Sequence, residues 1–312
     1  MLKGKFFLSW ALLALFFVGF SSCDDDDGTE NTPQTITEIA AGDAQFSTLV
    51  SLLQRVNLDA VLNGSGSFTV FAPTNAAFTA SGIDASQLTD EQVTEVLLYH
   101  VIGGLDLPSA DIREGQTYAT TAAETGPGGT QLSILVEKDA SGAVTVNGTT
   151  NVTTADIDAS NGVIHVINDV LLPLDIVGHA AANSEFTSLV GALSAAPGGL
   201  VALLQADGPY TVFAPVNQAF ADIQPTVDGL TPEQLATVLT YHVVPGLNVR
   251  KDALTNGQVV PTAATDETFT VNINGNDVTI TDDAGNEVNV MLTDVQATNG
   301  VIHVVDKVLL PF

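Results

Sequence analysis

Cysteine, tryptophan and basic residues are nearly absent from this chain of 312 residues. The single cysteine, Cys23, precedes the rest of the protein, so no disulfide stabilises the fold and each part must bury a sufficient core. Lysine and arginine together number 8 against 36 acidic residues, which gives a net charge of −28. A surface of this charge repels nucleic acids and anionic lipid headgroups, so nucleic-acid binding is excluded as a leading function.

Sequence patterns of the common catalytic and metal sites are also missing. No His-Glu-x-x-His pair, no Gly-Lys-Ser after a glycine-rich turn and no Gly-x-Ser-x-Gly elbow occurs. Asp156-Ile157-Asp158 begins like a calcium loop, but the position that needs glycine is Asn161, so we interpret the segment as a turn into the last strand. We therefore expect no metal, no cofactor and no enzymatic activity.

The N-terminus has the three-part layout of a secretion signal. Lys3 and Lys5 precede an apolar run over residues 6–20, and Ser21-Ser22-Cys23 follows. This end of the run resembles the bacterial lipoprotein box, which implies cleavage after residue 22, acylation of Cys23 and attachment to a membrane by lipid alone. An uncleaved helical anchor is the alternative, although the run is short for a membrane span.

Four consecutive aspartates, residues 24–27, follow Cys23 in a polar segment that ends at residue 34. A block of like charge stays solvated, so we expect residues 23–34 to form a flexible tether. The acidic run resembles the surface-export signal of bacterial lipoproteins, which implies an outer-membrane protein exposed on the cell surface. If the run is only a spacer, the protein is periplasmic.

The remainder of the chain consists of two copies of one module. Tyr99-His100 returns 142 residues later as Tyr241-His242. Two longer segments return as well, TVFAPTNAAF as TVFAPVNQAF and NGVIHVINDVLLP as NGVIHVVDKVLLP. A period of this length indicates tandem domains rather than a solenoid. We predict domains over residues 35–174 and 175–312, after a signal peptide over residues 1–22.

Within each copy, the hydrophobic period changes from helical to strand-like. Thr35, Thr89 and Thr231 each stand three residues before Glu or Gln, as in capping boxes, and apolar stripes of helical spacing follow them. Later, alternating apolar residues flank turn sequences such as Asn147-Gly148 and Asn274-Gly275, which predicts hairpins. Both copies are predicted to finish on strands that end at Pro173 and Pro311. Helices early and strands late indicate an α+β fold.

The repeated motifs together resemble the fasciclin, or FAS1, family. The resemblance covers both copies and implies a wedge of two β-sheets with helices packed around one end. In the first motif, Pro73 with Asn75 and Pro215 with Asn217 predict a tight turn that fixes the next helix. Phe71 and Phe213 of the same motif are assigned a structural role with them. Val216 departs from the usual threonine, so we expect this turn to lack a side-chain hydrogen bond.

The histidines could belong to a site or to the core. His100 and His242 end apolar helix stripes, while His165 and His303 lie on an apolar strand, so the better interpretation is core histidines with backbone partners. The resemblance adds a second possibility, because in animal members of the family the Tyr-His region has been taken as an adhesion surface. Tyr99, His100, Tyr241 and His242 are therefore the candidate interaction motif.

The leading prediction is a non-enzymatic adhesion or interaction protein, lipid-anchored at the cell surface, that binds an extracellular protein or glycan. A glycan-binding or polysaccharide-uptake accessory lipoprotein is the alternative, which the absence of tryptophan after Trp10 disfavours because aromatic rings usually stack on sugars. A hydrolase is the third hypothesis, and it requires accessible histidines.

Overall fold

The computed structural model describes residues 33–312. The predicted signal peptide, Cys23 and the aspartate run lie outside the described residues. Within residues 33–312, every helix is too short or too polar to cross a membrane.

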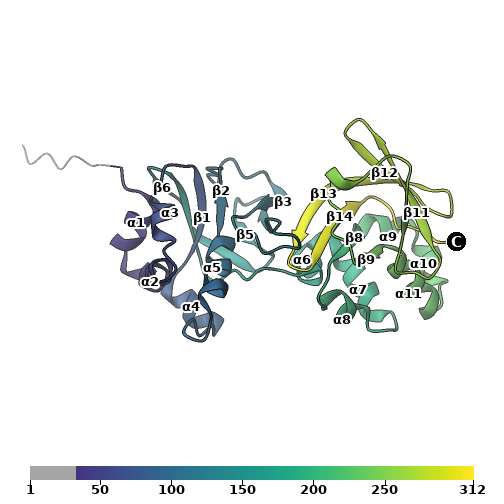
Figure 1. Ribbon diagram of the computed structural model, residues 1–312, viewed down its shortest axis with the longest axis horizontal. Coiled ribbons are helices and arrows are strands. Elements are labelled where there is room, and N and C mark those ends of the chain that lie inside the picture. Colours follow the sequence, from purple (N-terminus) through teal and green to yellow (C-terminus); the bar gives the residue numbers. More distant parts are fainter. Residues whose placement is uncertain (1–32) are drawn as a thin grey trace, which may run out of the picture. The chain divides into compact units, whose positions relative to one another are not determined.

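The first copy begins with helices and ends with strands (Figure 1). Its elements are α1 (Ile36–Gly42), η1 (Ala44–Phe46), α2 (Ser47–Arg55), α3 (Asp59–Leu62), β1 (Phe68–Pro73), α4 (Asn75–Ser81), α5 (Asp90–Tyr99), β2 (Val101–Gly103), β3 (Gly115–Thr120), β4 (Ser133–Lys138), β5 (Val144–Val146), β6 (Thr150–Ala159) and β7 (Gly162–Ile167). The α+β class predicted from the sequence is confirmed.

The second copy repeats this order with two additional short helices. Its elements are α6 (Ile176–Ala182), η2 (Ser184–Phe186), α7 (Thr187–Ala195), α8 (Leu200–Gln205), β8 (Tyr210–Pro215), α9 (Asn217–Asp222), α10 (Gln224–Asp228), α11 (Pro232–Tyr241), β9 (Val243–Pro245), η3 (Lys251–Ala253), β10 (Gln258–Pro261), β11 (Thr268–Asn274), β12 (Asp277–Thr281), β13 (Glu287–Ala297) and β14 (Gly300–Val305).

Local sequence explains where the main helices begin. The hydroxyls of Thr35, Thr89 and Thr231 accept hydrogen bonds from the third residue of α1, α5 and α11, and all three capping boxes are complete. Thr74 caps α4 in the same way through the amide of Ala77. Val216 caps α9 without a side-chain hydrogen bond, as predicted from its departure from threonine.

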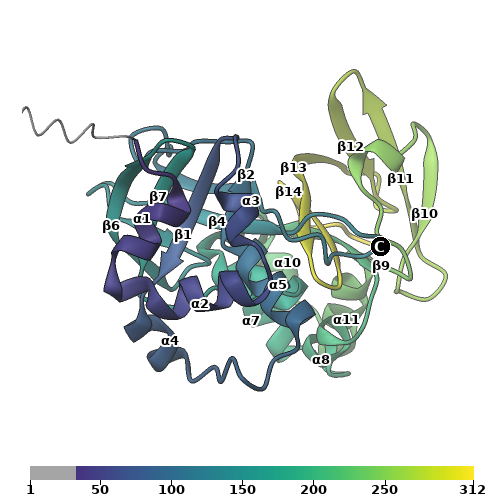
Figure 2. The ribbon, with the colours of Figure 1, turned by 60° about the vertical axis from the view of Figure 1, so that its left-hand side comes forward.

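Each copy contains one seven-stranded sheet. The strand order is β2-β1-β7-β6-β5-β4-β3 in the first copy and β10-β11-β12-β13-β14-β8-β9 in the second. The pairing of β6 with β7 shifts register twice along its length, and β6 also pairs with β5, so the two sheets of the expected wedge are continuous through this strand. Helices α1 and α2 lie against β1 and β7 on one side of the sheet (Figure 2).

The last strand of each copy runs parallel to β1 or β8 and ends when that partner ends. Strand β7 pairs with β1 as far as Ile167 opposite Pro73, and β14 pairs with β8 as far as Val305 opposite Pro215. The prediction that these strands continue to Pro173 and Pro311 is wrong, because the parallel partners β1 and β8 end opposite Ile167 and Val305. The residues that follow are irregular and partly buried.

Two apolar clusters form the interior of each copy. In the first copy, Phe46, Leu49, Leu97 and Ile164 belong to a cluster between the helices and the sheet. A second cluster, which includes Phe71, fills the space enclosed by the strands. The second copy has the equivalent pair of clusters. Each copy therefore buries its own apolar core, which a fold without disulfides needs for stability.

Contacts also join the two copies. Tyr118 of β3 packs on the helix-side cluster of the second copy, and its hydroxyl accepts a hydrogen bond from Asn183 at 3.1 Å. The amide of Gln296 in β13 donates to the hydroxyl of Ser133 at 2.9 Å. His179 of α6 is completely buried beside Tyr118, with 5.8 Å between the ring centroids, and neither ring nitrogen has a hydrogen-bond partner.

Candidate interaction site

Both Tyr-His pairs lie in the core of their domains. Tyr99 and Tyr241 are 0% exposed, and His100 and His242 are 2% exposed. The Tyr99 hydroxyl donates to the carbonyl of Ser133, and the Tyr241 hydroxyl donates to that of Thr268. These tyrosines therefore connect the end of α5 or α11 to the strand β4 or β11.

The two histidines make the same hydrogen bonds in both copies. Nε2 of His100 accepts from the amide of Leu171, so the ring proton is on Nδ1 and is donated to the carbonyl of Val96 at 2.7 Å. His242 bonds the amide of Leu309 and the carbonyl of Val238 in the same way. Burial lowers the pKa of each ring to about 4, so both are neutral at physiological pH.

His165 and His303 hold the loop that follows each Tyr-His pair. Nδ1 of His165 accepts from the amide of Asp156, so Nε2 carries the proton and donates to the carbonyl of Leu107 at 2.9 Å. His303 bonds the carbonyl of Val249 at 2.8 Å. The prediction of buried histidines with backbone partners is confirmed for all four of these residues.

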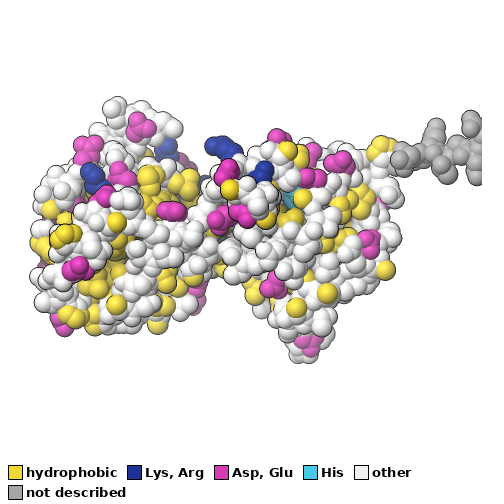
Figure 3. Space-filling model, turned by 180° about the vertical axis from the view of Figure 1, so that it is seen from behind, with side chains coloured by type: hydrophobic (Ala, Val, Ile, Leu, Met, Phe, Trp, Pro, Cys, Tyr) yellow, Lys and Arg dark blue, Asp and Glu magenta, His cyan; other side chains and the backbone are white. Residues whose placement is uncertain are grey.

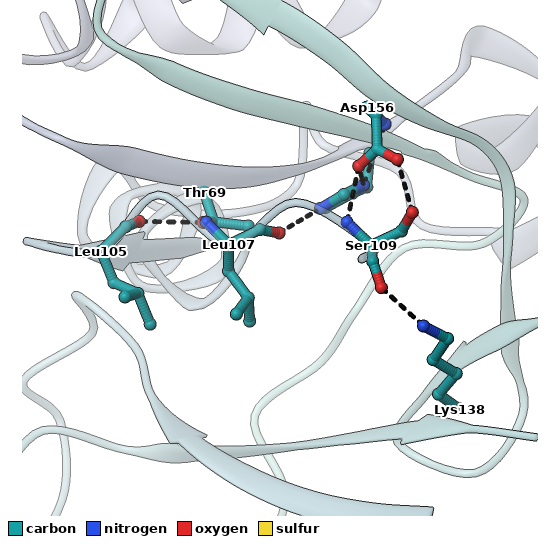
Figure 4. A network of polar contacts seen from close by, with 7 residues as sticks. Thr69, Leu105, Leu107, Ser109, Lys138 and Asp156 are labelled. Atoms are coloured by element: carbon teal, nitrogen blue, oxygen red, sulfur yellow. Dashed lines mark hydrogen bonds and ion pairs between the residues drawn. The ribbon is translucent and has the colours of Figure 1, made fainter. Parts of the chain in front are cut away.

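A threonine on β1 fixes the same loop from its other side (Figure 4). The hydroxyl of Thr69 donates to the carbonyl of Leu105 and accepts from the amide of Leu107, both at 2.9 Å. Thr211 makes the same two contacts with Leu247 and Val249. One buried hydroxyl thus closes each loop between two backbone groups, which restricts its conformation.

Charged residues hold the far end of the loop in the first copy. Asp156 accepts hydrogen bonds from both the amide and the hydroxyl of Ser109, and Lys138 donates to the carbonyl of Ser109 (Figure 4). Lys138 also donates to the carbonyl of Ile112. Partial burial raises the pKa of Asp156, but the bonds from Ser109 and the nearby His165 and Lys138 outweigh it, so the pKa lies below its ordinary value.

The second copy uses a related contact at this end. Asp294 accepts from the amide of Lys251 at 2.8 Å, and Arg250 lies 3.9 Å from its carboxylate. Asp156 and Asp294 both have positive φ, at register shifts of β6 and β13. The interpretation of residues 156–158 as a turn is therefore wrong: they lie within β6, and the bulge directs Asp156 towards the loop.

The anchored loops present one apolar side chain each to solvent. Leu105 is 44% exposed and Leu247 is 52% exposed, although the backbone of both residues is bonded to a buried threonine. The Tyr-His pairs therefore lie beneath a surface rather than on it. Their adhesion role stays a prediction, in which they would act by positioning these loops.

The first family motif also serves the fold. Phe71 and Phe213 are buried, and Asn75 links α4 to the start of α2 through the amide of Thr48 and the carbonyl of Ala44. Asn217 makes the equivalent contacts with Ser188 and Ser184. Pro73 and Pro215 end β1 and β8 just before these asparagines.

Sequence reasoning missed Thr69, Thr211 and a pair of buried asparagines. Asn161 accepts from the amide of Ile36 and donates to the carbonyls of Leu62 and Gly64, and Asn299 makes the equivalent three contacts in the second copy. Recurrence of a polar residue within an apolar motif in both copies was the signal that could have found them.

The described residues contain no group of three or more His, Cys, Asp or Glu side chains placed to hold a metal ion. All five histidines of the chain lie in this part, and each is at most 2% exposed. The fold and the site thus define a tandem-domain protein with rigidly held surface loops and an interior stabilised by buried polar contacts.

The fasciclin domain model matches this chain twice, over residues 44–173 and 184–311, and the chain belongs to the fasciclin family. The fold is similar to that of a FAS1 domain pair from the insect cell adhesion molecule Fasciclin I, with a TM-score of 0.50 and 20% identity over 83% of this chain and 92% of that one.

Relatives with similar sequences come from bacteria and animals. Protein sll1483 of Synechocystis is 42% identical over 46% of this chain and 76% of its own length. Human periostin is 31% identical over 86% of this chain, and pig transforming growth factor-beta-induced protein ig-h3 is 30% identical over 80%. The matched region spans 30% of periostin and 35% of ig-h3, so this chain corresponds to about a third of either protein.

Proposed function

We propose that this protein is a lipid-anchored, non-enzymatic interaction module of the cell surface that binds an extracellular protein or polysaccharide. The observation that carries the proposal is the pair of anchored loops after the Tyr-His motifs. Each is fixed by a buried threonine and a buried histidine, yet each exposes a leucine. Such preorganisation lowers the entropic cost of binding a partner.

The family relationship supports the same proposal. A domain pair of similar fold occurs in a cell adhesion molecule of insects. At 20% sequence identity, this similarity concerns the fold alone. A hydrolase that uses histidine would need accessible rings, and the histidines of this chain are buried. Attachment through acylated Cys23 and exposure at the outer face of the outer membrane belong to the proposal as well.

Proteolysis of intact cells that carry the full chain tests location and anchoring together. The expected result is that added protease removes residues 35–312 from wild-type cells, and that a Cys23→Ala variant is released from the membrane. Protection until the outer membrane is broken would contradict surface exposure, and a membrane-bound variant would contradict lipid attachment.

Attachment assays test the interaction itself. Cells that retain the anchor but lack residues 35–312 are expected to lose adhesion to matrix proteins or polysaccharide surfaces. Unchanged adhesion would refute the proposal. Tight and selective binding on a glycan array, with no protein partner, would instead favour the glycan-binding alternative.

A further inference from the structure

The sheet of the first copy is almost closed, but a seam remains between its two edge strands. Among residues 33–312, β2 is paired with β1 alone and β3 with β4 alone. One backbone hydrogen bond joins the two edges, from the amide of Ala122, just after β3, to the carbonyl of Val101 at 2.7 Å. Among the described residues, no other backbone hydrogen bond joins these edges.

Backbone groups line both sides of the seam. Successive residues of a strand direct their N–H and C=O groups to opposite sides, and Ala122 and Val101 direct theirs into the seam. Gly103 of β2 and Thr120 of β3 are two residues away, so their backbone groups face the seam as well. Neither residue has a ladder partner on that side. The seam therefore offers unpaired donors and acceptors at strand spacing.

A cavity of about 410 Å³ lies where the edges separate. Its lining includes the buried side chains of Ile102, Ile112 and Val136, and the exposed Leu105 stands beside it. A volume of this size is within the range of ligand sites and can admit large apolar side chains. A cavity beside two strand edges is an arrangement that can bind an extended peptide as an added strand. In such binding, backbone hydrogen bonds provide affinity and the cavity selects the side chain.

In the second copy, prolines occupy the two equivalent edge positions. Gly103 is opposite Phe68 in the pairing of β1 with β2, and Pro245 is opposite the equivalent Tyr210 in the pairing of β8 with β9. In the same way, Thr120 is opposite Ser133 and Pro261 is opposite Thr268. Ser133 and Thr268 are equivalent, because their carbonyls accept hydrogen bonds from the hydroxyls of the two core tyrosines.

Pro245 and Pro261 therefore remove both seam donors, although the bond that joins the edges is retained as Ala263 to Val243. Proline at a strand edge blocks pairing with another chain. The two copies thus differ at the backbone groups that an added strand would use.

The charge around the seam indicates which peptides fit. Asp106, Asp111 and Glu114 are exposed in the loop beside the cavity, against Arg113 of the loop and Lys138, which bonds two of the loop's carbonyls. The whole chain carries −28. Acidic side chains also outnumber basic ones among the apolar patches of the face drawn in Figure 3. Such a surface attracts cations and repels acidic partners.

We propose that the seam of the first copy binds an extended peptide segment of a partner protein, with a large apolar side chain in the cavity and basic residues beside it. The peptide adds a strand between β2 and β3, and it pairs with Gly103 and Thr120. The second copy does not bind in this way. This inference rests on the proposed interaction function, for which it names the site and the chemistry of the partner.

A peptide titration of the full chain tests the proposal. The probe is a labelled synthetic peptide of alternating phenylalanine and threonine flanked by lysines. Its binding is followed by fluorescence anisotropy and by the amide signals of Gly103 and Thr120. Saturable binding that shifts both signals is expected. Substituting Gly103→Pro and Thr120→Pro together should weaken binding roughly tenfold or more, since both backbone donors of the seam are lost. Both prolines are compatible with the fold, because the second copy has them at these positions.

Matched controls separate the possible sources of binding. A peptide with N-methyl groups on the pairing amides should not bind, and one flanked by glutamate should bind more weakly. Pro245→Gly with Pro261→Thr opens the second seam and should add a second site. Absence of binding, binding that survives the first pair of prolines, or equal binding of the glutamate peptide would overturn the proposal.

Cell-attachment assays distinguish a failure of the seam proposal from a failure of the proposed interaction function. If deletion of residues 35–312 abolishes attachment while the Gly103→Pro, Thr120→Pro variant attaches normally, the seam proposal is wrong and the interaction function stands. If the deletion has no effect, the proposed function fails, and the peptide titration decides on the seam independently.

Discussion

Replacing His179 with isoleucine should stabilise the protein, and more so in acid. His179 is buried, and both ring nitrogens lack a hydrogen-bond partner. Leaving a buried polar group without a partner costs about 1–3 kcal/mol. The equivalent position of α1 is Ile39, so isoleucine is compatible with this helix. We expect His179→Ile to raise the free energy of unfolding by about 1 kcal/mol or more at pH 8.

The pH dependence follows from the environment of the ring. Burial lowers the pKa of His179 from 6.5 to about 4, and the nearby backbone of Gln296 acts in the opposite direction. Tyr118 is the titratable group packed against it, and its own pKa is raised to about 12 by burial, so it stays neutral. Neither a carboxylate nor a cation contributes to the shift.

Because the folded-state pKa is depressed, the stability due to the neutral ring is complete above pH 6.5 and is lost as the pH falls towards 4. One pKa unit corresponds to about 1.4 kcal/mol, so the wild type loses about 2 kcal/mol between pH 8 and pH 5 through this ring. His179→Ile removes that loss. The advantage of the variant should therefore grow by about 2 kcal/mol at pH 5.

Urea unfolding followed by circular dichroism at pH 8 and pH 5 measures both quantities. His242→Ile is the matched control: His242 is equally buried but bonds Val238 and Leu309, so its removal leaves two buried backbone groups unpaired and should lower stability at pH 8. A His179→Ile variant that is less stable than wild type at pH 8, or that has the same pH dependence, would refute the reasoning.

Three further variants test the local contacts. Val216→Thr should stabilise the second copy by about 0.5–1 kcal/mol by restoring the cap that Thr74 provides in the first, and an unchanged urea midpoint would contradict this. Asn161→Ala should cost roughly 2–3 kcal/mol, because three buried hydrogen bonds are lost; a cost below about 1 kcal/mol in urea unfolding would mean that water replaces the side chain. Thr69→Val should accelerate amide exchange at Leu107 without changing exchange in the second copy, and equal protection would show that the loop is fixed by other contacts.

Local signals in the sequence predicted most of the fold. The capping boxes at Thr35, Thr89 and Thr231 depend on residues three positions apart, and the hairpin turn at Asn147-Gly148 needs two residues with positive φ, so neighbouring residues suffice to predict them. The repeated motifs indicated the family and two domains. The end of β7 was mispredicted because a strand ends where its partner ends, and that partner, β1, is distant in sequence.

Composition and order of residues thus determined the α+β class, the duplication, the strongly acidic surface and the buried state of His100 and His165. The tertiary structure alone decided what those buried groups hold in place, because Leu107 and Thr69 meet only after β1 and the following loop are assembled. It also decided which backbone donors are left unpaired. Gly103 and Thr120 are ordinary residues in the sequence, and their difference from Pro245 and Pro261 gains meaning only from strand register, which long-range pairing sets.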